Sequence, residues 1–98
     1  MSSDTAFHID EPLVIGNAAA QRQSLMQALD IGAGVFDLSG VAECDTAGVQ
    51  LLLAAQKTAQ ALGTPLALCN ASAPVRELFD RYGLGSLLSA GSPEGPKT

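Results

Sequence analysis

Short apolar runs alternate with longer segments of helical periodicity along this chain. The apolar runs are bounded by Gly, Pro, Asn or Ser, which is typical of short strands that end in turns. Extended segments are therefore predicted at 6–9, 13–15, 34–38 and 66–69. The segments between them are rich in helix formers and stop close to a glycine. Helices are predicted at 17–29, 46–62 and 72–82.

Strands that alternate with helices through short connections predict an α/β domain with a small, mostly parallel central sheet flanked by helices. The segments 34–38 and 66–69 are nearly continuous apolar runs, which indicates that both faces of these strands are covered. The domain is expected over residues 5–88. Residues 89–98 are rich in Gly, Pro and Ser, and we expect them to form a loose tail because they offer few apolar side chains for packing.

The predicted helix at 46–62 carries more apolar residues than one core face needs. On a helical wheel the following residues gather around Gly48 and form a sufficient core face: Leu51, Leu52, Ala55, Ala59 and Leu62. Val49 and Leu53 fall outside that face, on the side of Thr46, beside the polar Gln50 and Lys57. Two interpretations remain open. Val49 and Leu53 pack under a neighbouring helix, or they form a strip that binds a protein partner.

Thr46 stands where the loop 39–45 meets this helix, at the carboxyl end of a predicted strand, where functional loops of parallel sheets gather. Asp45 can cap the helix by accepting a hydrogen bond from the amide of Ala47 or Gly48, which leaves the Thr46 hydroxyl exposed. The small side chains of Ala47 and Gly48 would let another protein approach. Phosphorylation of Thr46 would add about −1.5 to −2 charges, which a helix N-terminus tolerates but a seated partner does not. A plain helix cap is the alternative interpretation.

The partner-binding residues predicted in this way are Asp45, Thr46, Val49, Gln50, Leu53 and Lys57. An enzyme is not expected, because the only histidine, His8, is far in sequence from any hydroxyl or thiol that it could activate. Asp37, Glu43 and Asp45 could be drawn as a carboxylate cluster for Mg²⁺, yet their placement differs from that of phosphoacceptor receiver domains. No metal site and no cofactor are predicted. Cys44 and Cys69 are expected to be small buried side chains.

Composition narrows the possible classes of protein. The chain has 98 residues and a formal net charge of −5, which suits one compact domain and argues against binding to a nucleic-acid backbone. Two cysteines do not form a disulfide framework, and they suit a reducing compartment. The apolar runs are too short to span a membrane, and the first residues do not resemble a secretory signal. A cytoplasmic protein is expected.

The loop and the following helix carry a longer pattern. The segments Asp37-Leu38-Ser39-Gly40-Val41 and Asp45-Thr46-Ala47-Gly48-Val49, with 63–68, 72–75 and Gly83-Leu84 in the same order, resemble the signature of STAS domains, the anti-sigma factor antagonist fold. The resemblance covers roughly residues 12–88. At 15–18, Ile-Gly-Asn-Ala stands where the family usually has a G-[ED]-[LI]-D stretch.

This resemblance implies a phosphoacceptor at the start of the second helix, with Thr46 in the place of the usual serine. A kinase/anti-sigma partner would bind the unmodified form, phosphorylation would end the contact, and a phosphatase would reset it. Threonine at this place also resembles stand-alone STAS subunits that bind the ATPase of lipid-transport ABC systems. The segments 47–52 and 83–88 resemble small STAS proteins of chemotaxis-type gene clusters. The partner, the pathway and the oligomeric state stay open.

Overall fold

Residues 6–88 of the chain are described by the structure, a computed structural model. Strands alternate with helices, as the sequence predicted. The elements are β1 (Ala6–His8), a 3₁₀ turn η1 (Ile15–Asn17), α1 (Ala18–Asp30), β2 (Val35–Asp37), α2 (Thr46–Ala61), β3 (Ala67–Cys69), α3 (Ala73–Arg81) and a second 3₁₀ turn η2 (Gly85–Leu87). The predicted tail at 89–98 lies outside the described residues.

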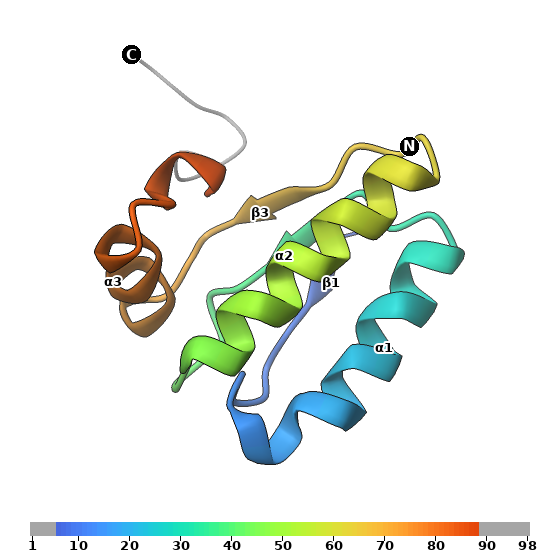
Figure 1. Ribbon diagram of the computed structural model, residues 1–98. Coiled ribbons are helices and arrows are strands. Elements are labelled where there is room, and N and C mark those ends of the chain that lie inside the picture. The colour runs from blue at the N-terminus through green and yellow to red at the C-terminus, as the bar shows by residue number, and fades with distance from the viewer. Residues whose placement is uncertain (1–5, 89–98) are drawn as a thin grey trace.

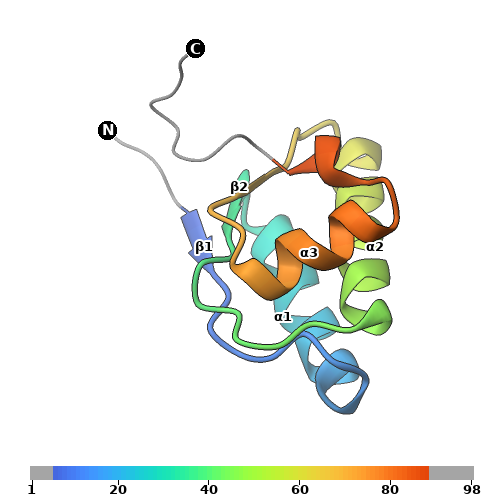
Figure 2. The ribbon, with the colours of Figure 1, turned by 90° about the vertical axis from the view of Figure 1, so that its left-hand side faces the viewer.

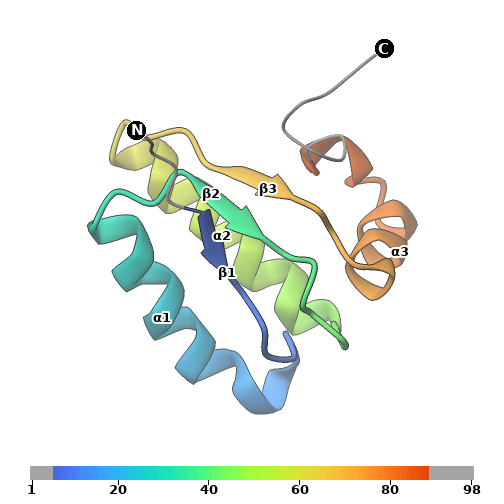
Figure 3. The same ribbon diagram turned by 180° about the vertical axis from the view of Figure 1, so that it is seen from behind.

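The three strands form one parallel sheet in the order β1-β2-β3. Phe7, Phe36 and Leu68 stand opposite one another in the register, and they face the helices. α1 and α2 lie on the same face of the sheet, while α3 lies beyond the β3 edge (Figures 1 and 3). This is the expected α/β architecture, in which each parallel connection contains a helix.

The expectation that both strand faces are covered holds for one face only among the described residues. Side chains alternate between the faces of a strand, so Val35 and Ala67 point away from α1 and α2. Both are half-buried, and none of the described helices lies over them. The apolar runs misled the prediction because Val35 and Ala67 are too small to need a second layer of helices.

The predicted extended segment at 13–15 is reduced to one bridge. Leu13 pairs with Cys44 in a parallel bridge, donating to the Glu43 carbonyl at 2.8 Å and accepting from the Asp45 amide at 3.0 Å. The chain then enters η1 at Ile15 and leads directly into α1. A second strand cannot form here, because the helical turn begins two residues after the bridge.

The core lies between the sheet and the helices. Its largest fully buried side chains are Phe36, Phe79, Ile9, Leu13, Leu25, Leu38, Leu52 and Leu68. Burying each contributes roughly 1.5–3 kcal/mol. Leu62 was expected there but is 56% exposed, because it follows the last residue of α2, where 60–63 are all exposed. No helix within residues 6–88 is both long and apolar enough to cross a membrane.

Gly63 and Gly83 end α2 and α3 as predicted. Their φ angles are 77° and 72°, in the left-handed region that glycine adopts at low cost. Ser72, where the predicted helix 72–82 begins, stands at the N-cap of α3, but its hydroxyl does not cap the helix. Asn17 likewise precedes α1 without capping it, and its side-chain amide donates instead to the Pro12 carbonyl at 3.2 Å.

Candidate functional site

The candidate site is the start of α2, where the loop after β2 meets the helix. Asp45 is the N-cap residue, and its Oδ1 accepts from the Gly48 amide at 3.2 Å, which confirms the predicted cap. Its Oδ2 accepts from the Ile15 amide at 3.1 Å. One carboxylate therefore ties η1 to α2. Thr46 follows as the first residue of the helix, and it is exposed.

Gly48 serves the fold rather than an approaching partner, so the expectation that it leaves room for another protein is wrong. It is buried against the chain of its own domain. A Cβ at this position would clash with the Leu13 carbonyl oxygen, and it would stand 2.7 Å from Leu13 Cβ and 3.0 Å from Cys44 Sγ. The missing side chain thus allows α2 to pass close to the Leu13–Cys44 bridge.

Tyr82 brings a second hydroxyl to the site. Thr46 Oγ1 and Tyr82 Oη are 2.6 Å apart, a normal hydrogen-bond distance for two hydroxyls. The spacing of Val75, Leu78, Phe79 and Tyr82 is that of one helix face, and Val75 and Phe79 are fully buried. Tyr82 is 48% exposed at the end of that face, with its polar tip at Thr46. The sequence gives no signal for this pairing, since the two residues are 36 positions apart.

Ile15 is a further residue at the site that the sequence did not single out. Its amide is held by Asp45, and it is 76% exposed. Ile15 and Tyr82 are both large exposed apolar residues, and each is hydrogen-bonded to one of the first two residues of the site, Asp45 and Thr46. The two residues thus place exposed apolar side chains next to the polar Asp45 and Thr46.

Val49 does not belong to the partner-binding strip, because it is 3% exposed and lies in the core. The wheel assigned α2 one core face toward the sheet, but α2 also packs against α1 and α3. Val49 lies between the sheet-facing residues and Thr46, which contacts α3 through Tyr82. The buried face of α2 therefore extends further toward α3 than contact with the sheet alone would require.

The other predicted strip residues do share a face. Thr46, Gln50, Leu53 and Lys57 occupy positions i, i+4, i+7 and i+11 of α2, which lie on one side of a helix. Gln50 and Lys57 are exposed. Leu53 is half-buried against the core, and with Gln50 and Lys57 it lines one hollow on the surface of α2. Below, "the α2 strip" means Thr46, Gln50, Leu53 and Lys57.

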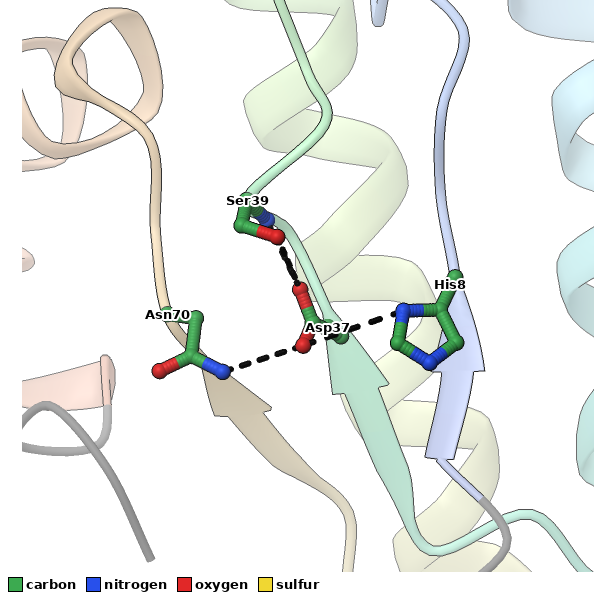
Figure 4. Close-up of polar contacts among 4 residues, drawn as sticks. All are labelled: His8, Asp37, Ser39 and Asn70. Carbon is green, nitrogen blue, oxygen red and sulfur yellow. Dashed lines mark hydrogen bonds and ion pairs between the residues drawn. The ribbon is translucent and has the colours of Figure 1, made fainter.

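Asp37 ends β2 and joins residues from both neighbouring strands (Figure 4). Its Oδ1 accepts from the amide and the hydroxyl of Ser39 at 2.9 and 2.7 Å, and its Oδ2 accepts from Asn70 Nδ2 at 3.0 Å. His8 Nδ1 lies 3.8 Å from the same oxygen. The bond from the Ser39 hydroxyl is the main cause that lowers the pKa of Asp37. The hydrogen-bond partners of this carboxylate thus lie at the carboxyl end of the sheet. A metal cluster would need it to gather with Glu43 and Asp45 instead.

The two cysteines are unpaired thiols. Cys69 is buried at the end of β3, as expected. Cys44 is half-buried, and burial, with a smaller contribution from the Asp45 charge, raises its pKa to about 11. Since the thiolate is the reactive form, this shift disfavours a reactive Cys44 at neutral pH.

The chain belongs to the STAS domain family, whose family model matches residues 2–93. Its fold is similar to the solved structure of the anti-sigma factor antagonist SpoIIAA in its unphosphorylated form, with a TM-score of 0.69 and 21% sequence identity. The similarity covers 91% of this chain and 80% of that one. A comparison with curated protein sequences gives no match. Family and fold are established by these findings together with the parallel βα order of the domain.

Proposed function

We propose that this protein is a non-catalytic interaction module of the anti-sigma factor antagonist type. It binds a kinase/anti-sigma-type protein in the cytoplasm, and phosphorylation of Thr46 switches the contact off. The observation that carries this proposal is the exposed Thr46 hydroxyl at the first position of a capped helix in a STAS domain.

The surroundings of Thr46 support a switch that acts on binding. Ile15 and Tyr82 offer apolar contacts, and the α2 strip continues the surface along the helix. A phosphate on Thr46 would place about −1.5 to −2 charges within this surface, close in sequence to the exposed Glu43. The helix N-terminus stabilises a negative charge by about 0.3–1 kcal/mol, so the domain stays folded while a docked partner meets a desolvated charge.

Replacing Thr46 tests the switch directly. Thr46→Glu should weaken binding to the purified kinase/anti-sigma partner at least about tenfold, which is about 1.4 kcal/mol. Thr46→Ala should bind but accept no phosphate, and Thr46→Ser should bind and be phosphorylated. Calorimetry gives the affinities and intact mass gives the phosphorylation, with melting temperature as the check of folding. Binding of Thr46→Glu at wild-type strength would contradict the proposal.

Lys57 tests the α2 strip without disturbing the core, because it is fully on the surface, whereas Leu53 packs against buried residues. Lys57→Glu should weaken partner binding about threefold or more and leave the melting temperature within about 2 °C of the wild type. Arg76→Glu is the matched control, since Arg76 is an exposed base on α3 and its replacement changes the net charge equally. If both variants lost affinity equally, the loss would come from the change in net charge. The α2 strip would then not be the binding surface.

A second candidate function rests on the identity of residue 46. Threonine in place of the usual serine favours a STAS subunit that binds an ABC transporter ATPase through α2, while the segments 47–52 and 83–88 favour a small STAS protein of a chemotaxis-type cluster. Lys57→Glu should weaken binding under either function. Transfer of phosphate from the partner to Thr46 is required only by the antagonist role, so the mass measurement separates the two.

A further inference from the structure

Tyr82 reaches the candidate phosphorylation site from a different part of the fold. It directly follows α3, which is anchored by the fully buried Val75 and Phe79, and α3 lies against α2 (Figure 2). Its hydroxyl stands 2.6 Å from that of Thr46. The backbone position of Tyr82 is therefore set by the core packing of α3.

The two hydroxyls share one hydrogen bond in the unmodified protein. Each has one hydrogen to donate and two acceptor positions, so either residue can be the donor. In this state Tyr82 holds the Thr46 hydroxyl in one orientation.

After phosphorylation only one of the two residues can be the donor of this hydrogen bond. A kinase would transfer the phosphoryl group of a nucleoside triphosphate to Thr46 Oγ1: the Oγ1–P bond forms, the bond to the nucleoside diphosphate breaks, and a base of the kinase accepts the hydroxyl proton. Oγ1 then has no hydrogen, so only Tyr82 can donate. The acceptors next to it are the oxygens of the new phosphoryl group, and hydrogen bonds to such charged acceptors are roughly twice as strong as neutral ones.

We propose that Tyr82 is a positioning residue for the phosphorylation site, a role that rests on the proposed function. It orients the hydroxyl of Thr46 in the unmodified protein, and it donates its own O–H to the phosphoryl group of the modified protein. Tyr82 thereby fixes the phosphate against the end of α3. Tyr82 is 48% exposed, so a partner protein can contact its ring. Such a partner would contact Tyr82 both when Thr46 is unmodified and when it is phosphorylated.

Phosphorus NMR tests the second half of this proposal without a partner protein. Phosphothreonine is installed at position 46 during synthesis, in the wild-type sequence and with Tyr82→Phe. Donation to the dianion favours the dianion, so the second phosphate pKa should be lower in the wild type, by roughly half a unit to one unit. Phenylalanine keeps the ring, and only the hydroxyl is lost. Equal pKa values in the two proteins would overturn the proposal.

The unmodified protein tests the first half of the proposal. Tyr82 is the only tyrosine of the chain, so labelled tyrosine gives a single Cζ resonance. With ¹³C-labelled tyrosine, the Cζ resonance of Tyr82 should shift in Thr46→Val, which removes the hydroxyl and keeps the shape. Thr58→Val on the same helix is the matched control and should leave the resonance unchanged. An unshifted resonance in a folded Thr46→Val protein would also overturn the proposal.

Both measurements are independent of the proposed function. If phosphothreonine at 46 leaves partner affinity unchanged while the Tyr82 shifts are observed, the switch is wrong, and the hydrogen bonds of Tyr82 to residue 46 remain without a regulatory role. If the shifts are absent while the phosphate abolishes binding, the positioning role alone is wrong.

Discussion

Gly48→Ala should destabilise the domain by about 3 kcal/mol or more and lower its melting temperature by more than about 10 °C. The added Cβ would clash with the Leu13 carbonyl oxygen, and it would lie too close to the Leu13 side chain and to Cys44 Sγ. Leu13 cannot retreat freely, because its carbonyl accepts the Asp45 amide and its amide donates to Glu43. The gain of about 1 kcal/mol in helix propensity from Gly to Ala offsets only a part of this cost. Thermal and urea unfolding measure the effect.

Gly16→Ala is the matched control for this prediction. Gly16 is exposed in η1, no heavy atom would lie within 4 Å of the new Cβ, and its φ is not in the left-handed region. The free energy of unfolding of the Gly16→Ala protein should stay within about 0.5 kcal/mol of that of the wild type. A Gly48→Ala protein as stable as Gly16→Ala would mean that α2 can move away from the Leu13–Cys44 bridge without cost.

Asp37→Asn should destabilise the domain by about 1.5–3 kcal/mol at neutral pH, because the amide offers one acceptor oxygen where the carboxylate offers two. Either Ser39 or Asn70 then loses its partner. Asp30→Asn is a suitable control, since Asp30 is an exposed aspartate at the end of α1. Urea unfolding at pH 7 measures the difference.

The difference in unfolding free energy between the wild type and Asp37→Asn should depend on pH. The folded-state pKa of Asp37 is lowered, mainly by the Ser39 hydroxyl, so the carboxylate contributes its stability above the unfolded pKa of about 3.9. That contribution is lost as the pH falls through the folded value. The gap between wild type and Asp37→Asn should therefore shrink as the pH falls below about 4. A gap that widens below about pH 4 would contradict the assignment.

The sequence predicted the fold class and the Asp45 cap because both depend on local patterns. Short apolar runs, helix formers and stop glycines are readable within a few residues, and they placed α2 within one residue of its observed end. Val49 was misassigned because a helical wheel describes one helix and cannot count its neighbours. Gly48 was read as an opening for a partner for the same reason, since the residue that fills the space, Leu13, is 35 positions earlier.

Tyr82 shows a different limit. Its spacing from Val75 and Phe79 is that of one helix face, but the direction of a hydroxyl at the end of that face depends on where α3 lies relative to α2. Ile15 lay in a predicted extended segment, and its exposure followed from the turn that replaced it. Contacts between elements thus carried the part of the site that local patterns could not supply.

The register of the sheet also bears on how this chain reaches its native state. Ala6 pairs with Val35, and Val35 pairs with Ala67, so each strand pairing closes a loop of about thirty residues that contains one helix. Closing such loops costs chain entropy before three-residue strands return any ladder hydrogen bonds. We therefore expect helices α1 and α2 to form and collapse onto their apolar faces first, with strand pairing completing the folding of the domain rather than nucleating it.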